Sequence, residues 1–281
     1  MPKTRLDLLM VERGLADSRA QAQRLVMAGQ VRLDGQVALK PSTSVDASAE
    51  LTIDQPPPFV SRGGEKLQAA LQEFGVSPQG HTCADVGAST GGFSDCLLQH
   101  GATRVYAIDV GQGILHWKLR QDPRVVVMEK TNARYLEHLP EPVTMVTIDA
   151  SFISLKVLLP VVCNWFPPGE IPLESNHLLA LVKPQFEAGR KQVARGDGVI
   201  RDPQIHRQVL LDVLASALQD GYTIRGLLRS PLLGPKGNVE FLAWLSYCIP
   251  QATAGPEPQL PSEPIADLQA LIDSAVPPSQ T

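Results

Sequence analysis

DVGASTGGF, residues 85–93, is the stretch of sequence that decides the fold. A short apolar strand, CADVGA, leads into it, and GGFSDCLLQHG continues from it as a helix that ends at Gly101. Open α/β sheets bind nucleotides at such a turn between strand and helix, and glycines there let the backbone approach a ligand closely. The stretch therefore predicts the nucleotide-binding turn of a parallel sheet.

Strands and helices alternate downstream of this turn. Apolar strands are expected within 104–110, 124–130, 143–150 and 177–184, and helices within 153–164 and 203–219. Two closing strands, YTIRGLLRS and VEFLAWLSY, are joined by a turn rich in Gly and Pro. This order predicts a doubly wound, Rossmann-like α/β sheet that is mostly parallel, with one antiparallel strand at the end.

A smaller α+β domain is expected before the sheet. Two helices, within 5–15 and 18–27, precede two short strands around the turn Asp34-Gly35. A proline run at 56–58 indicates a linker. We therefore predict a first domain over 1–55, a linker over 56–65, a catalytic domain over 66–250, and a Pro-rich acidic tail over 251–281. The tail is expected to be largely disordered, with one amphipathic segment that could dock.

Charge is distributed unevenly along the chain. The net charge of −4 resides in the tail, which has four acids and no base, whereas residues 1–32 hold six bases and three acids. This surplus suits either a phosphate-binding arm or a solvated helix face. The four cysteines lack metal-ligand spacing, so buried thiols in a reducing compartment are expected, and no metal. No signal peptide or membrane span is recognisable, which favours a cytoplasmic protein.

The glycine turn favours a sulfonium cofactor over a dinucleotide. Ser89 occupies the position where a dinucleotide fingerprint has its middle glycine, and its side chain would obstruct a pyrophosphate. Asp85 is an acid beside a turn without Lys or Arg, which suits the cationic cofactor S-adenosylmethionine. Asp109 ends the next strand and can accept both ribose hydroxyls, and Asn132 is expected at the adenine. The predicted cofactor-binding residues are Asp85, Gly87, Ser89, Thr90, Gly91, Gly92, Phe93, Asp109 and Asn132.

The first 55 residues resemble a known RNA-binding domain. The segment SRAQAQRLVMAGQVRLDGQV, residues 18–37, is similar to the alpha-L domain first described in a small-subunit ribosomal protein. The resemblance covers about residues 3–55. It implies that a basic face, made of Arg5, Arg19, Gln23 and Arg24, is turned toward RNA backbone.

The catalytic domain resembles the FtsJ-like ribose methyltransferases. That class implies a Lys-Asp-Lys-Glu tetrad, which matches Lys66 in SRGGEKL, Asp149 in TIDASFIS, Lys183 in LVKPQFE and Glu240 in GNVEFLAWL. Over residues 3–248 the whole chain is similar to the TlyA (hemolysin A) family. The resemblance implies 2′-O-methylation of cytidine in ribosomal RNA, with ribosomal RNA or ribosomal subunits as partners.

The residue types of the tetrad suit a proton transfer from a ribose hydroxyl. Burial beside a second lysine would lower the pKa of Lys183, so that it could deprotonate or orient the 2′-hydroxyl. Asp149 and Glu240 would hold the two ammonium groups, and Lys66 would position the nucleotide. Glu240 is an acid in an apolar strand and needs a cationic partner, for which Lys183 is the expected candidate. The segment 188–203 is expected to be a substrate loop, with Arg190, Lys191 and Arg195 near RNA phosphates.

Three other functions are weighed against this hypothesis. An NAD-dependent oxidoreductase is disfavoured by Ser89 and by the RNA-binding first domain. A non-enzymatic RNA-binding or assembly protein would require the tetrad to be inert. A pore-forming hemolysin is disfavoured because no signal peptide, membrane span or strongly cationic amphipathic helix is recognisable in the sequence.

Overall fold

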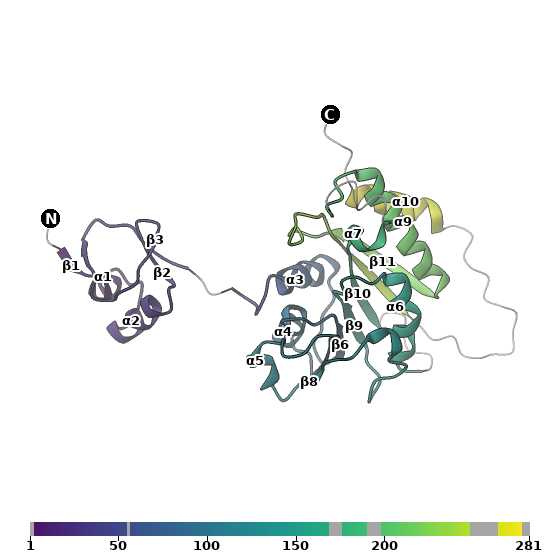
Figure 1. The fold of residues 1–281 in the computed structure, drawn as a ribbon, viewed down its shortest axis with the longest axis horizontal. Coiled ribbons are helices and arrows are strands. Elements are labelled where there is room, and N and C mark those ends of the chain that lie inside the picture. Colours follow the sequence, from purple (N-terminus) through teal and green to yellow (C-terminus); the bar gives the residue numbers. More distant parts are fainter. Residues whose placement is uncertain (1–2, 55–56, 169–175, 190–197, 248–263, 277–281) are drawn as a thin grey trace, which may run out of the picture. The chain divides into compact units, whose positions relative to one another are not determined.

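The computed structural model describes residues 3–54, 57–168, 176–189, 198–247 and 264–276 (Figure 1). The chain divides into two compact units, Met1–Pro58 and Phe59–Thr281. Phe59 is buried and packs against Gly64, so the second unit begins earlier than the predicted start at residue 66. Three predicted RNA contacts, Arg190, Lys191 and Arg195, lie outside the described residues.

The first unit packs two helices against short strands. The expected turn is present: Asp34 and Gly35 both have positive φ, 50° and 80°, as a two-residue hairpin requires. Leu6, Met10 and Val26 are fully or almost fully buried between the elements. The elements are β1 (Lys3–Arg5), α1 (Leu6–Glu12), α2 (Arg19–Met27), β2 (Val31–Leu33), β3 (Gln36–Val37), β4 (Ser44–Asp46) and β5 (Leu51–Ile53). Strands β1 and β4, which pair with each other, were not predicted.

The second unit is built on a seven-stranded sheet in the order β11-β12-β10-β9-β6-β7-β8. Only β12 runs antiparallel to its neighbours, which confirms the predicted mostly parallel sheet. The strands are β6 (Thr82–Val86), β7 (Arg104–Ile108), β8 (Val125–Met128), β9 (Met145–Ile148), β10 (His177–Val182), β11 (Tyr222–Arg229) and β12 (Phe241–Tyr247).

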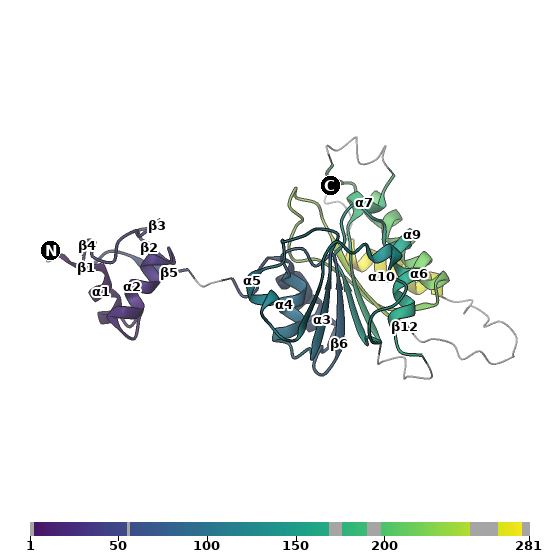
Figure 2. The same ribbon diagram turned by 60° about the horizontal axis from the view of Figure 1, so that its bottom comes forward.

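Helices cover both faces of this sheet (Figure 2). The first face carries α3 (Gly63–Phe74), α4 (Gly92–Gln99) and α5 (Trp117–Arg120); the second carries α6 (Leu155–Val162), α9 (Pro203–Gln219) and α10 (Pro264–Ala275). Shorter elements are η1 (Ala133–Tyr135), η2 (Cys163–Trp165) and α7 (Pro184–Glu187).

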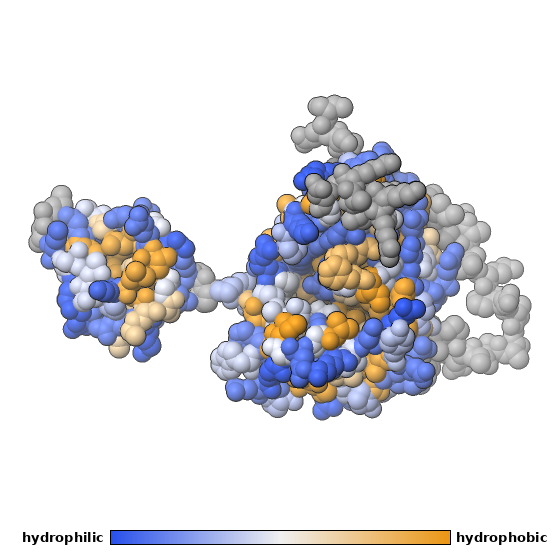
Figure 3. Space-filling model, viewed as in Figure 1, coloured by the Kyte–Doolittle hydropathy of each residue, from blue (hydrophilic) through white to orange (hydrophobic). Residues whose placement is uncertain are grey.

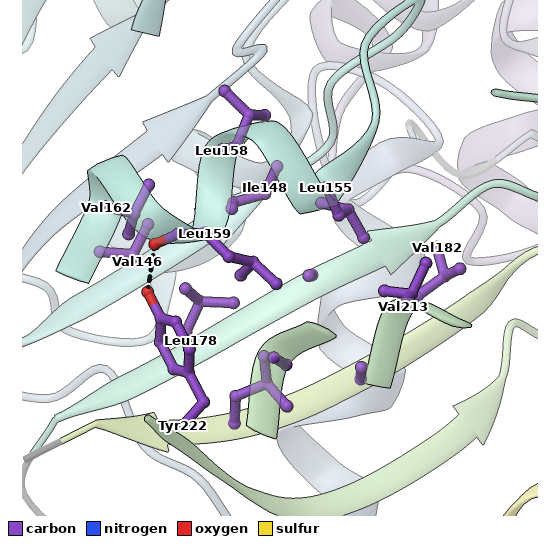
Figure 4. Close-up of a cluster of buried hydrophobic side chains, with 14 of the residues drawn as sticks. Val146, Ile148, Leu155, Leu158, Leu159, Val162, Leu178, Val182, Val213 and Tyr222 are labelled. Atoms are coloured by element: carbon purple, nitrogen blue, oxygen red, sulfur yellow. Dashed lines mark hydrogen bonds between the residues drawn. The ribbon is translucent and has the colours of Figure 1, made fainter. Parts of the chain in front are cut away.

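Burial on both faces explains why the central strands are largely apolar on both of their faces. Along β10, Leu178 and Ala180 join the core under α6 and α9, while Leu179 and Leu181 join the core under α3 and α4. Figure 4 shows the first of these cores, where the Tyr222 hydroxyl donates to the Leu159 carbonyl at 2.8 Å.

The C-terminal helix lies in the amphipathic segment of the tail that was expected to dock. α10 packs on α9 and β11 with Leu268, Ile272 and Val276 buried, while residues 251–263 and 277–281 lie outside the described residues. Arg207 of α9 pairs with Asp273 at 2.8 Å. The apolar face of this segment therefore buries against the sheet domain, which offsets the entropy that a disordered tail would keep.

Candidate active site

The glycine turn after β6 lies directly against the turn after β9. Gly87 has φ +81°, and a Cβ at this position would come within 2.7 Å of the Asp149 carbonyl oxygen. Gly92 is equally restricted, because a Cβ there would overlap the Ser61 hydroxyl at the start of α3. These two glycines let three segments meet: the end of β6, the end of β9 and the N-terminus of α3.

Four charged side chains from four elements converge there as two ion pairs. Lys183, after β10, pairs with Asp149, after β9, with Nζ 2.6 Å from Oδ1. Lys66, in α3, pairs with Glu240, before β12, with Nζ 2.5 Å from Oε2. Both lysine side chains and Glu240 are largely buried. The predicted pairing of Glu240 with Lys183 is therefore wrong, because α3 brings Lys66 to Glu240 while β9 and β10 are neighbours.

Additional hydrogen bonds hold the two pairs in place. The Lys183 ammonium also donates to the Ser151 hydroxyl at 3.0 Å and to the Asp149 carbonyl at 3.3 Å. Gln185 donates to Glu240 at 3.4 Å. Burial raises the pKa of the Asp149 carboxyl, and the nearby Lys183 opposes this increase. Two lysine ammonium groups and the carboxylates of Asp149 and Glu240 therefore lie close together.

Two adjoining cavities open beside these pairs. The larger, about 600 Å³, contains all four charged residues. The smaller, about 280 Å³, is lined by Asp109, Val110 and Asn132. The two share the walls made by Gly87, Ser89, Asp149, Ser151 and Phe152. A molecule in each cavity would therefore meet at Asp149 and the glycine turn.

Most of the predicted cofactor residues lie in these walls. Asp109 accepts hydrogen bonds from the backbone amides of Ser89 at 2.8 Å and Gly111 at 2.7 Å, which fixes its carboxylate at the smaller cavity. Asn132 is exposed beside it. The larger cavity includes Thr90, Gly92 and Phe93.

Asp85 and Gly91 are the exceptions, because neither lines a cavity. The Asp85 carboxylate is fully buried below the turn, where Ser94 donates to it at 2.6 Å and Thr147 at 3.0 Å. Burial raises the pKa of Asp85 to about 7. Contrary to the prediction of a cofactor contact, Asp85 supports the turn from below.

Several lining residues were not predicted. Phe152 is 91% exposed, has φ +64°, and packs on Phe186 with ring centroids 4.9 Å apart. The larger cavity also has two exposed cations, Arg62 and Lys236, which have no ion pair among the described residues. The space-filling view shows apolar surface gathered on this face of the unit, between hydrophilic borders (Figure 3). No local pattern distinguishes these residues from ordinary surface residues.

The predicted basic face of the first unit is more ordered than expected. Arg5, Arg19 and Gln23 all donate to the buried carboxylate of Asp7. Arg24 is exposed, and its side chain has no hydrogen bond or ion pair in the described part of the chain.

Two family descriptions match the chain, one for each unit. The FtsJ-like methyltransferases match residues 59–247, and the S4 domain matches residues 4–51. Within the described residues, no helix is long and apolar enough to cross a membrane. No cluster of His, Cys, Asp and Glu that could hold a metal is found there either.

Similar proteins cover nearly the same length. The 16S/23S rRNA (cytidine-2′-O)-methyltransferase TlyA of Mycobacterium tuberculosis is 46% identical over 86% of this chain and 90% of the relative. Hemolysin A of Brachyspira hyodysenteriae is 38% identical over 85% of this chain and 98% of the relative. A solved structure of a proposed hemolysin from Streptococcus thermophilus is 41% identical, with a TM-score of 0.67, covering 98% of this chain and 96% of that chain.

Proposed function

The chain belongs to the TlyA (hemolysin A) family of FtsJ-like methyltransferases, and from this premise we propose that it methylates a ribose 2′-hydroxyl of ribosomal RNA. Family membership makes it an S-adenosylmethionine-dependent methyltransferase. The ribose acceptor, the ribosomal RNA and the roles of single residues are the proposal. The observation that carries it is the convergence of two Lys–carboxylate pairs in the larger cavity, with Asp149 on the wall that this cavity shares with the smaller one.

The smaller cavity suits the adenosine part of S-adenosylmethionine. Each Asp109 carboxylate oxygen has a lone pair left for a ribose hydroxyl after accepting one backbone amide. Val110 supplies an apolar wall, and Asn132 an amide at its rim. The cofactor supplies an electrophilic methyl group, and the glycine turn leaves room for its chain between the cavities.

The larger cavity suits the target nucleotide. Lys183 is our candidate for the group that acts on the 2′-hydroxyl, and Asp149 holds its Nζ at 2.6 Å. As an ammonium Lys183 would orient the hydroxyl oxygen, and only as a neutral amine would it take the hydroxyl proton. Lys66, fixed by Glu240, would hold the reacting oxygen or its phosphate. Much of the rate of such a displacement comes from alignment, which four buried, mutually bonded side chains favour.

Charge at the larger cavity favours an RNA substrate. Its lining has four cationic side chains, Arg62, Lys66, Lys183 and Lys236, against Asp149 and Glu240. The two buried lysines are neutralised by these acids, so the surplus comes from exposed Arg62 and Lys236. Phosphates on either side of a target nucleotide are the anions that these residues would meet.

The substrate is proposed from the relatives and the first unit together. The TlyA proteins are named for cytidine in 16S and 23S rRNA, and the S4 domain supports binding to structured RNA. We therefore propose cytidine in ribosomal RNA, in a cytoplasmic enzyme whose partners are ribosomal RNA or ribosomal subunits. Arg5, Arg19, Gln23, Arg24, Arg190, Lys191 and Arg195 remain the proposed RNA contacts.

The test is methyl transfer from labelled S-adenosylmethionine to ribosomal subunits and to free ribosomal RNA. The wild type is compared with Lys183→Ala and with Arg225→Ala, which removes an exposed charge in the middle of β11 that lines neither cavity. The proposal would be supported if the wild type labelled the RNA and the labelled nucleotide were followed by an internucleotide bond that resists alkali. The label should be lost with Lys183→Ala and should persist with Arg225→Ala.

Two other outcomes would contradict it. Label on RNA that remains sensitive to alkali would indicate base methylation. Binding of RNA and S-adenosylmethionine without any transfer would favour a non-catalytic RNA-binding protein.

A further inference from the structure

In the first unit, three of the proposed RNA-contacting side chains donate hydrogen bonds to one buried carboxylate. The Asp7 side chain is 0% exposed. Arg5 binds it through two nitrogens, Nε to Oδ1 at 3.0 Å and Nη2 to Oδ2 at 2.9 Å. Arg19 Nε and Gln23 Nε2 reach Oδ2 at 3.0 and 2.9 Å. One acid therefore fixes side chains from the end of β1 and from α2.

The local structure explains why the charge of Asp7 is retained in this position. Asp7 lies in the first turn of α1, where the helix dipole favours a negative charge. Arg19 and Gln23 are four residues apart, so both lie on the face of α2 that meets α1. Hydrogen bonds, first of all from Arg5, keep the pKa of the Asp7 carboxyl far below that of a free aspartate. Asp7 is thus ionised at any pH at which RNA binding would be measured.

The arginines keep free donors despite these bonds. Arg5 Nη1 and both terminal nitrogens of Arg19 have no partner among the described residues. The two side chains are 41% and 52% exposed. The bonds to Asp7 fix each planar guanidinium along one edge, so the free N–H donors on its other edge point in a defined direction. Such a planar set of donors matches the spacing of phosphate oxygens.

We propose that Asp7 organises Arg5, Arg19 and Gln23 into a preformed binding site for phosphodiester groups of RNA. This inference rests on the proposed RNA-binding function and adds the residue that positions the contacts. The ordering of two long side chains then occurs on folding rather than on binding, which favours affinity. Asp7 would act without touching the RNA.

The sign of the charge provides a sharp test. Asp7→Asn makes the face more positive by one charge, so a purely electrostatic surface would bind RNA more tightly. If Asp7 positions the arginines, binding weakens instead. We expect the dissociation constant of the full-length protein for ribosomal subunits to rise about fivefold or more. The slope of its logarithm against the logarithm of salt concentration should fall by about one.

A second pair of variants covers the case in which Asp7→Asn unfolds the first unit. Arg5→Lys keeps the charge but loses the two-nitrogen bond to Asp7, whereas Arg32→Lys makes the same change at an arginine that pairs with Asp54 and is not a proposed RNA contact. We expect weaker binding only for Arg5→Lys, with S-adenosylmethionine affinity unchanged in both.

The outcomes separate this inference from the proposed function. The site would be overturned if folded Asp7→Asn bound RNA as tightly as the wild type or more tightly. Equal RNA binding by Arg5→Lys and Arg32→Lys would overturn it as well. A wild-type protein that binds neither ribosomal RNA nor ribosomal subunits would instead overturn the proposed function.

Discussion

Lys66, Asp149, Lys183 and Glu240 neutralise one another in two pairs inside the larger cavity. Taking one charge of a buried pair away costs about 3–5 kcal/mol, because its partner is left without compensation. Pairing therefore lets the fold keep four charges close to the proposed reaction. It also means that a stability measurement must accompany every activity measurement on these residues.

Asp85 yields a prediction about stability and pH. Its folded-state pKa of about 7 lies above the ordinary value of 3.8. The unfolded chain thus loses this proton first, and the free energy of unfolding falls as pH rises between about 4 and 7, then stays constant. Asp85→Asn removes this titration. The stability of the variant relative to the wild type should rise by about 2–3 kcal/mol from pH 5 to pH 8.

Urea unfolding followed by tryptophan fluorescence measures this difference. All three tryptophans lie in the second unit, so the signal reports on the unit that contains Asp85. Asp212→Asn, at an exposed position of α9, is the matched control. A constant difference between Asp85→Asn and wild type across this pH range would contradict the prediction.

At the scale of elements, the turns after β9 and β10 are joined at several points. Besides the Lys183–Asp149 pair, Phe152 packs on Phe186. Glu187 accepts hydrogen bonds from the Ser154 hydroxyl at 2.5 Å and the Leu155 amide at 2.7 Å, at the start of α6. The two turns therefore behave as one unit that carries Asp149 and Lys183.

Glu187→Ala should lower kcat by about tenfold, because the turns lose these bonds and the catalytic pair loses its alignment. Affinity for S-adenosylmethionine should stay unchanged. Glu187→Gln should retain most of the activity, since its amide can accept from Leu155 and donate to Ser154. Single-turnover methylation with saturating RNA measures the effect, with exposed Glu137→Ala as control. Equal rates for Glu187→Ala and wild type would refute the role.

At the scale of the molecule, the second unit includes a helix from the far C-terminus. Residues of α10 pack on α9 and β11, although the 16 residues 248–263 separate α10 from β12. Ile272 is fully buried there, next to the core beneath α6 and α9. This packing indicates that the segment belongs to the methyltransferase unit.

Ile272→Ala should destabilise the second unit by about 2–4 kcal/mol, the usual cost of a large-to-small change in a core. Urea unfolding followed by tryptophan fluorescence measures it. Gln269→Ala, on the exposed side of the same helix, should leave the unfolding midpoint unchanged. If Ile272→Ala also leaves the midpoint unchanged, α10 does not contribute to the stability of the unit.

The sequence by itself determined the order of the elements and the class of the fold. The glycine turn at 85–93, the Asp34-Gly35 hairpin and the apolar strands are local patterns, and each depends on residues close together in the chain. The resemblance to the FtsJ-like class implied the four tetrad residues, and the glycine turn accounts for part of the cavity walls. The amphipathic pattern at 265–276 indicated a segment that could dock, but it did not indicate that α9 and β11 would be the partner surface, because its own residues do not describe that surface.

Only the tertiary structure decided which charges meet. Glu240 pairs with Lys66, 174 positions earlier, and not with Lys183, because the sheet order sets β9 beside β10 while α3 packs over the glycine turn. Asp7 likewise selects Arg5, Arg19 and Gln23 through the packing of α1 on α2. Ion pairing depends on distances of a few ångströms, and these follow from the packing of elements that no local pattern specifies.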